Sequence, residues 1–158
     1  MENKIKKTIS VWLIVEDGEN KGKIPLQKRS LDNKRFVYIC QSTWAGKVEE
    51  NEEVIDAVKR ECEEEMGKEF AEKFDFSALK LFCKNKYKID NKDWEAHSFS
   101  GTVNDELLKL AKLHHEAFSR FIFVTKGDKT YSMSSGKDPQ KNIILFDDQQ
   151  KVLEKIFK

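Results

Sequence analysis

The spacing of apolar residues divides the chain into extended and helical segments. Extended segments are predicted where β-branched and aromatic residues gather between turn residues, at residues 9–15, 24–28, 36–40, 79–83, 96–103 and 121–125. Helices are predicted where apolar residues recur every three or four positions, at residues 52–66, 105–118 and 147–157. Residues 126–141 contain glycine and proline and are predicted to form a loop. Strands interleaved with helices in this way indicate a mixed α/β fold.

The predicted helix at residues 52–66 has the clearest pattern. Its residues are nearly all good helix formers, and Gly67 follows where a glycine cap would end the helix. An apolar stripe recurs along it at spacings of three and four and consists of Val54, Ile55, Val58, Cys62 and Met66. We expect this stripe to be buried against the core of the domain.

Three glutamates share one face of this helix. At about 100° per residue, Glu61, Glu64 and Glu65 fall within an arc of about 100°. Like charges at positions i and i+4 repel each other, so some other group must offset the repulsion. A hard divalent cation does so, because magnesium is commonly held by a few carboxylates together with substrate phosphates. The alternative is a solvated acidic face, which is the usual role of an acidic run in a helix.

The spacing of the residues around this face favours the metal site. The chain has Gly46, five residues, Glu52, seven residues, and then the run Arg60-Glu61-Cys62-Glu63-Glu64-Glu65-Met66-Gly67. Residues 46–68 resemble the Nudix box, and all seven fixed positions of that motif match. Chance would give such a match about once in ten million windows. The segment departs from the motif in two apolar positions, which hold Cys62 and Lys68.

The resemblance implies a fold and an activity. The expected fold is a Nudix-type α/β/α sandwich with a mixed sheet, formed by residues 1–158 as a single domain. The expected activity is that of a pyrophosphohydrolase that depends on magnesium or manganese and cleaves the diphosphate linkage of a nucleoside-diphosphate-linked compound. Nucleoside triphosphates, dinucleoside polyphosphates and ADP-sugars all contain this linkage.

The resemblance also implies roles for residues of the box. Glu64 and Glu65 are expected to ligate magnesium, and Glu61 is expected to be a ligand or the base that prepares the attacking water. Arg60 is expected to pair with Glu52 and hold the loop and the helix in register.

Two further metal ligands are expected outside the helix. One is the backbone carbonyl of Ala45, just before the box. The other is Glu116, because residues 114–121 resemble a Glu-His and aromatic-Arg pattern of some nucleotide-cleaving members. His115 is the alternative base, but magnesium favours a carboxylate over an imidazole. Without such a role, Glu116 would lie on the exposed end of a helix.

Three residues are candidates for contact with the substrate. Lys28 and Arg29 end a predicted strand in a segment similar to the second strand of the family, where they would meet a phosphate or remain solvated. Trp44 stands beside the box and, if exposed in a loop, would stack on a base.

Composition limits the partners and the compartment. The formal net charge is +1, with 29 basic and 28 acidic residues, which argues against a nucleic acid polymer as a partner and allows a small nucleotide substrate. Cys40, Cys62 and Cys83 are too widely separated for a zinc site or a disulfide framework, which favours a reducing, cytoplasmic compartment. No membrane association is expected, since the apolar run at residues 9–15 is too short to span a bilayer. The resemblance also suggests a homodimer.

Proteins of two other functional classes are weighed against the enzyme. A Nudix-fold sensing module would bind a nucleotide without cleaving it and would be expected to lose carboxylates of the box, all of which are retained here. An acidic-helix interaction protein would show no response to magnesium. Within the enzyme class, a Nudix-fold isomerase acting on a prenyl diphosphate would need a dedicated cysteine and glutamate arrangement, which the sequence does not display.

Overall fold

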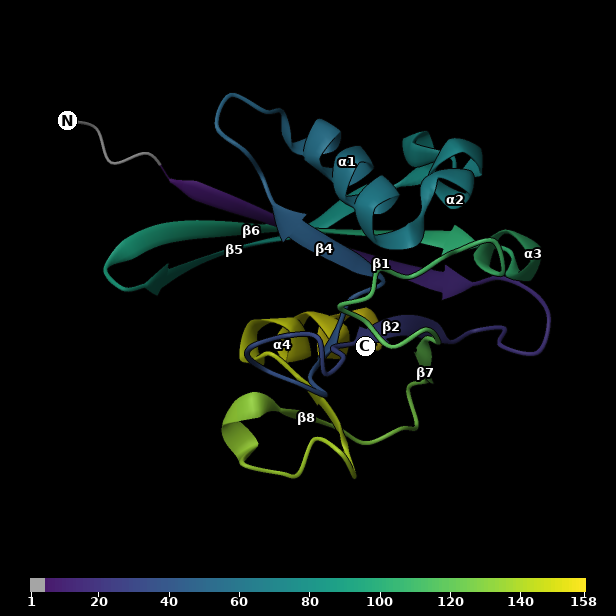
Figure 1. Cartoon of the computed structure of the whole chain (residues 1–158). Coiled ribbons are helices and arrows are strands. Elements are labelled where there is room, and N and C mark those ends of the chain that lie inside the picture. Colours follow the sequence, from purple (N-terminus) through teal and green to yellow (C-terminus); the bar gives the residue numbers. More distant parts are fainter. Residues whose placement is uncertain (1–4) are drawn as a thin grey trace.

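The computed structural model describes residues 5–158 and has helices on both sides of a four-stranded sheet (Figure 1). The strand order of this sheet is β4-β1-β6-β5. β1 runs parallel to β6 and antiparallel to β4, and β5 runs antiparallel to β6, so the sheet is mixed. The bounds of these strands are Lys6–Val15 for β1, Trp44–Lys47 for β4, Lys80–Ile89 for β5 and Lys92–Val103 for β6.

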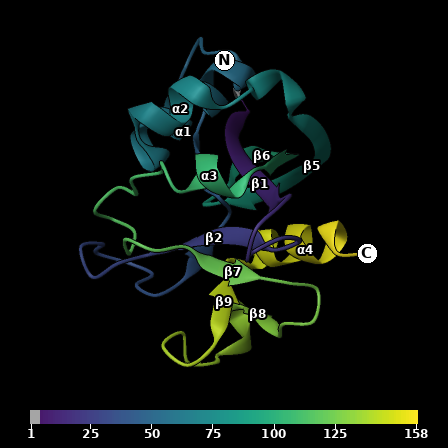
Figure 2. The same ribbon diagram turned by 90° about the vertical axis from the view of Figure 1, so that its right-hand side faces the viewer.

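One face of this sheet is covered by α1 (Val54–Met66) and α2 (Lys68–Lys73), as Figures 1 and 2 show. The buried residues of α1 are Ala57, Val58, Cys62 and Met66. The predicted stripe is therefore correct at its centre and its end. It is wrong at Ile55, which is 41% exposed, because Ala57 takes the inward position instead.

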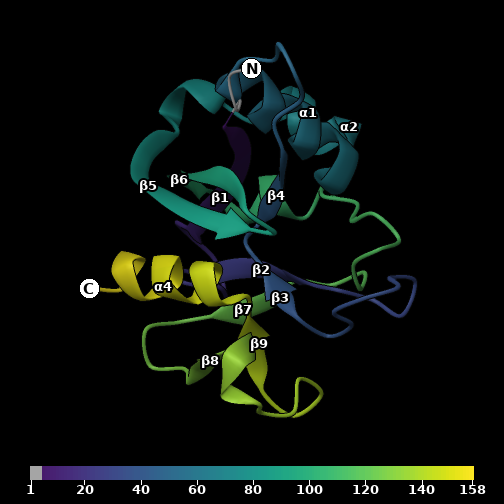
Figure 3. The same ribbon diagram turned by 90° about the vertical axis from the view of Figure 1, so that its left-hand side faces the viewer.

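The opposite face is covered by α4 (Asp147–Ile156) and by a second sheet of five shorter strands, which Figure 3 shows from the left-hand side of Figure 1. The order of the second sheet is β7-β2-β3-β9-β8. Its strands are β2 at Ile24–Lys28, β3 at Cys40–Gln41, β7 at Ile122–Val124, β8 at Thr130–Ser132 and β9 at Ile143–Leu145. The α/β/α arrangement with mixed sheets agrees with the prediction from the sequence.

β1 is the common wall of two hydrophobic clusters. Alternate side chains of a strand point to opposite faces. Ile9, Val11 and Leu13 therefore join the cluster under α1, whereas Trp12 joins the cluster of the second sheet and α4. Burial on both faces makes β1 the strand against which both helical layers pack.

The predicted helix at residues 105–118 is mostly wrong. Only α3, Asp105–Leu108, is helical, and the chain then extends toward α1 and β2. The Lys112 N–H donates to the Met66 carbonyl at 2.8 Å, and the Phe118 N–H donates to the Lys28 carbonyl at 2.9 Å. These tertiary hydrogen bonds replace the helical ones, so the good helix formers in this segment do not decide its conformation.

The predicted strand at residues 36–40 is also wrong, except for Cys40 in β3. Phe36 and Tyr38 have φ values of 60° and 69°, which no extended strand contains. The predicted loop at residues 126–141 holds β8 and a 3₁₀ turn, Met133–Ser135, and a second 3₁₀ turn, Phe76–Ala78, precedes β5. Within residues 5–158, no helix has both the length and the apolar composition needed to cross a membrane.

A two-residue turn joins β5 to β6. Ile89 pairs with Lys92, and between them Asp90 and Asn91 both have positive φ values, 51° and 64°. Two central residues of this kind define a type I′ turn, whose twist matches that of the flanking strands.

We expect Asn91→Val to destabilise the protein and Asn91→Gly to leave its stability equal or higher. The left-handed conformation costs a β-branched residue about 1–2 kcal/mol of conformational energy, whereas it costs glycine none. For a chain of this size the valine variant should lose about 2–8 °C in Tm. The measurement is thermal unfolding followed by circular dichroism. Equal Tm values for the two variants would show that this turn does not limit stability.

Candidate active site

Arg60 of α1 binds the loop that precedes the helix. Its Nε donates to Glu52 Oε2 at 2.9 Å and its Nη2 donates to Glu52 Oε1 at 3.0 Å, so the pair is bidentate. Nη2 also donates to the carbonyl of Lys47 at 2.8 Å, at the end of β4. These hydrogen bonds lower the pKa of Glu52 and raise that of Arg60. The ion pair expected between Arg60 and Glu52 is present, and it joins helix, loop and strand.

Glu61 lies directly over Gly46 of β4. An ideal Cβ at position 46 would stand 2.1 Å from Glu61 Cδ and 2.4 Å from its Oε1, so the carboxylate fills the space of the missing side chain. Arg60 Nη1 donates to Glu61 Oε1 at 2.8 Å. Burial nevertheless raises the pKa of Glu61, and the charge of Glu64 adds to this effect. The motif therefore needs a glycine at this position for a steric reason, because any side chain would prevent the close approach of the Glu61 carboxylate to the strand.

Glu65 is held by neutral donors. Its Oε1 accepts hydrogen bonds from the Ala45 N–H and from Gln27 Nε2, each at 3.2 Å. Burial, together with the charges of Glu61 and Glu64, raises the pKa of Glu65 to about 8 in spite of these bonds. Gln27 was not among the predicted site residues. The signal that could have identified it is its place in the strand segment that resembles the family.

Glu64 is the most exposed of the three glutamates, with 57% of its side chain accessible. Its Oε1 lies 3.5 Å from Arg60 Nη1, which also binds Glu61. The guanidinium therefore offsets part of the repulsion within the acidic face. Glu65 has no cation at comparable distance among residues 5–158, and its pKa, which burial raises, reflects this lack of a charged partner.

Residues 112–118 lie against the C-terminal end of α1 and the end of β2. The His114 N–H donates to the Glu65 carbonyl at 3.3 Å, and the Ser30 N–H donates to the Glu116 carbonyl at 2.9 Å. Arg29 is partly buried, which lowers its pKa, while the charges of Glu116 and Glu65 both act in the opposite direction. The fold thus brings Glu116 and Arg29 into the neighbourhood of Glu65, although all three are far apart in sequence.

A compact group of ligand atoms occurs in the same loop. One ligand atom each of His114, His115 and Glu116 lies within 4.8 Å of the others, and all three residues are exposed. His115 Nδ1 is also 3.2 Å from Asp32 Oδ2. Within the described part of the chain, the three glutamates of α1 do not form a group this tight.

Trp44 corrects one prediction. It was expected in an exposed loop, but it is fully buried in β4, and its Nε1 donates to the carbonyl of Val58 at 3.0 Å. Its ring packs edge-on against Phe70, Phe74 and Phe76. A large aromatic side chain is more stable in this core than in solvent, so Trp44 cannot stack on a substrate base.

Lys28 lies at the end of β2 as the sequence predicts. Its ammonium is 5.5 Å from the centre of the Tyr38 ring, and Tyr38 stacks on Phe118 with ring centres 5.9 Å apart. The lysine therefore rests on an aromatic pair beside Arg29 and the loop of Glu116.

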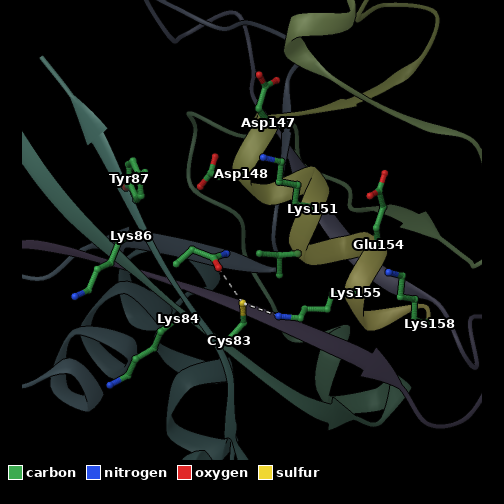
Figure 4. Close-up of a pocket in the computed structure, with 12 residues that line it drawn as sticks. Cys83, Lys84, Lys86, Tyr87, Asp147, Asp148, Lys151, Glu154, Lys155 and Lys158 are labelled. Carbon is green, nitrogen blue, oxygen red and sulfur yellow. Dashed lines mark hydrogen bonds between the residues drawn. The ribbon is translucent and has the colours of Figure 1, made fainter.

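A separate cavity of about 640 Å³ lies on the other side of the sheet, between β5 and α4 (Figure 4). Lys155 of α4 reaches Cys83 Sγ at 3.6 Å in this cavity, and Tyr87 and Asp148 also line it. Burial raises the pKa of Asp148. No pattern in the sequence points to this cavity, because its lining comes from two segments about sixty residues apart in the chain.

The sequence profile of the NUDIX domain matches residues 6–133 of the chain. A search of curated protein sequences gives no match. A solved structure with a similar fold is the MutT protein from Methanosarcina mazei Go1, with 18% identity over 99% of this chain and 95% of that chain, and a TM-score of 0.62.

Two other solved structures share the fold. The MutT NUDIX hydrolase from Burkholderia pseudomallei has 17% identity over 97% of this chain and 98% of that chain, with a TM-score of 0.54. The Ap4A hydrolase of C. elegans in a binary complex has 15% identity over 77% of this chain and 81% of that chain, with a TM-score of 0.51. At these identities the structures establish similarity of fold.

We expect a double-mutant cycle of Arg60→Gln and Glu52→Gln to give a coupling energy of about 1–2 kcal/mol. The pair is bidentate and partly buried. Hydrogen bonds between charged groups contribute more to stability than hydrogen bonds between neutral groups. The measurement is chemical unfolding of the four proteins. The matched control is the exposed pair Lys68–Glu72, with a 3.8 Å separation, whose cycle should give less than about 0.5 kcal/mol. Equal coupling in both cycles would contradict a structural role for Arg60.

Proposed function

The chain belongs to the Nudix family and is a Nudix pyrophosphohydrolase, and we propose that it cleaves the diphosphate linkage of a nucleoside-diphosphate-linked compound with magnesium or manganese as its cofactor. The observation that carries this proposal is the position of the acidic face of α1 on the edge of β4. There Glu61 rests on Gly46 and Glu65 accepts a hydrogen bond from Ala45.

The donor atoms at this edge suit magnesium. Glu61, Glu64 and Glu65 offer carboxylate oxygens, which this ion prefers over nitrogen or sulfur. The Ala45 N–H points toward Glu65 and away from β1. In an antiparallel ladder the N–H and C=O of one residue point to the same side, so we expect the Ala45 carbonyl to lie on the side of Glu65 and to be a fourth oxygen ligand. A bound cation would favour the ionised form of Glu65, whose pKa burial otherwise raises.

A divalent metal at this site would polarise the phosphoryl oxygens and make a bound water easier to deprotonate. Glu61 would accept the proton of the attacking water or bind the metal beside Glu64. Arg60 would act as a positioning residue, because it holds Glu61 at 2.8 Å while its bidentate bond to Glu52 fixes the loop. The residues of the box would thereby keep their carboxylates on one side of the scissile linkage.

The loop at residues 112–118 would supply groups on the other side. We propose Glu116 as an additional acidic ligand or base, because Arg29 lies under the influence of both Glu116 and Glu65. Arg29 and Lys28 would bind phosphate oxygens there. His115 remains the alternative base, but its imidazole is already paired with Asp32.

We expect the purified protein to hydrolyse at least one compound in a panel of nucleoside triphosphates, dinucleoside polyphosphates, ADP-sugars and nicotinamide dinucleotides. Activity should require magnesium or manganese and disappear with chelator. Glu64→Gln and Glu65→Gln should each lower kcat at least about a hundredfold, since each removes a charged oxygen ligand. The measurement is chromatographic separation of the products.

The control for these variants is Glu63→Gln on the same helix. Glu63 is exposed and lies outside the acidic face, so this variant should keep most of its activity. Equal losses for Glu63→Gln and Glu64→Gln would contradict the assignment of the face. Tight nucleotide binding without turnover would instead favour a sensing module.

We expect Gly46→Ala to lower kcat at least about tenfold while changing the free energy of unfolding by less than about 1 kcal/mol. The added methyl group would displace the flexible end of Glu61 but leave the core intact. The matched control is Gly127→Ala, whose Cβ would meet nothing closer than 3.9 Å. Assays of both variants at saturating magnesium and unfolding in urea provide the comparison. Full activity of Gly46→Ala would show that the position of Glu61 over β4 is not required.

A further inference from the structure

A turn at residues 114–117 presents two histidines and a glutamate to solvent. One ligand atom each of His114, His115 and Glu116 lies within 4.8 Å of the others. The two imidazole rings are adjacent, with ring centres 4.1 Å apart. Two ligands of one zinc ion lie about 3–4 Å apart, because each stands about 2.0–2.2 Å from the metal. Small rotations of these exposed side chains would therefore bring all three to one ion.

The backbone of this turn is held by hydrogen bonds. The Ala117 N–H donates to the His114 carbonyl at 2.9 Å and closes the turn. Ser30, in the loop after β2, binds the next two carbonyls: its Oγ donates to that of His115 at 2.6 Å, and its N–H donates to that of Glu116 at 2.9 Å. The two loops lie side by side in Figures 2 and 3. Since the backbone is already fixed, binding an ion would order only three side chains.

The hydrogen bonds of the side chains leave ligand atoms available. His115 Nδ1 lies 3.2 Å from Asp32 Oδ2. Because an ionised carboxylate only accepts, Nδ1 carries the proton, and Nε2 of the neutral ring keeps the lone pair that binds a metal. The same pairing with a carboxylate orients histidine ligands in metal sites generally. His114 Nδ1 accepts one long hydrogen bond, 3.3 Å, from the Glu116 N–H, and the Glu116 carboxylate accepts none from residues 5–158.

The ligand types select the ion. Two imidazoles and a carboxylate are the protein ligands of some catalytic zinc sites, whereas magnesium prefers oxygen ligands and retains several waters. Imidazole also suits other divalent ions late in the first transition row. The glutamates of α1 offer oxygen atoms only. The turn and the acidic face should therefore prefer different ions.

We propose that His114, His115 and Glu116 bind a zinc ion or a similar divalent transition-metal ion, with Asp32 as the partner that orients His115. This site goes beyond the proposed function, because its ligands lie outside α1 and an ion can occupy it without turnover. Glu116 is the one ligand that the proposed function also gives to magnesium. The tests below therefore measure binding and use variants of the two histidines and of Asp32.

The first experiment measures metal binding by the untagged, metal-free protein. Zinc chloride and magnesium chloride are titrated separately in a calorimeter. We expect the Kd for zinc to be at least about a hundredfold below that for magnesium, since imidazole nitrogen suits zinc and not magnesium. His114→Ala and His115→Ala should each raise the Kd for zinc at least about tenfold, and Asp32→Ala should raise it by a smaller factor. The matched control is Glu64→Gln, which removes a carboxylate from α1 and should leave the Kd for zinc unchanged.

The second experiment identifies the nitrogen ligands by NMR of the imidazole protons. The chain has three histidines, and His97 is an internal control, because it is buried and paired with Glu95. Zinc should shift the resonances of His114 and His115, which the two alanine variants assign, and should leave those of His97 in place. The cysteines are all buried, so the folded protein should not bind the ion through them.

The outcomes separate this inference from the proposed function. Equal affinity for zinc in the wild type and in both histidine variants would place the ion elsewhere and overturn the site. Shifts of the His114 and His115 resonances that are as large with magnesium as with zinc would overturn the choice of ion. Hydrolysis of the nucleotide panel by a protein whose histidines do not respond to zinc would overturn the site and leave the hydrolase intact. Zinc binding by the two histidines of a protein that hydrolyses no compound would support the site and overturn the proposed function.

Discussion

The packing of α1 on β4 is the constraint on which the candidate site depends. Glu61 reaches the strand only because Gly46 has no side chain, and Glu65 meets the Ala45 N–H on the same strand. The same interface buries Trp44, whose indole N–H binds the carbonyl of Val58 in α1. The core and the carboxylates therefore share one contact, and a shift of the helix would move both. This coupling keeps acidic side chains close together in spite of their repulsion.

The glutamates beside β4 differ in how their charges are compensated. Arg60 offsets part of the negative charge of Glu61 and Glu64, whereas Glu65 has only neutral donors. At the other end of the strand, the Lys47 ammonium lies 5.6 Å from the centre of the Trp94 ring. The net charge of +1 is the balance of 29 basic and 28 acidic residues and does not describe the charges around β4. The low net charge argues against a general polyanion surface and does not exclude a local anion site.

Local patterns in the sequence were sufficient to predict the elements that have a regular spacing of apolar residues. β1, β2, α1 and α4 have regular periodicity and clear ends, so their apolar faces and termini are encoded within a few consecutive residues. The spacing of the Nudix box is also local, since Arg60 and Glu52 lie eight residues apart and meet across a single loop and helix turn. Both the fold class and the acidic face could therefore be predicted from the sequence alone.

The sequence by itself determined which residues form the box and which helix carries it, whereas the tertiary structure decided what surrounds them. Residues 109–118 have helical propensity, but hydrogen bonds to α1 and β2 hold them as a loop beside Glu65. Trp44 is buried because α1 and α2 cover it, which no pattern around residue 44 reveals. Gln27 of β2 reaches Glu65 of α1 only through tertiary packing, and Lys6 meets Trp94 only through the pairing of β1 with β6. Long-range pairing is a property of the packed sheet, and residue type and local spacing contain little information about it.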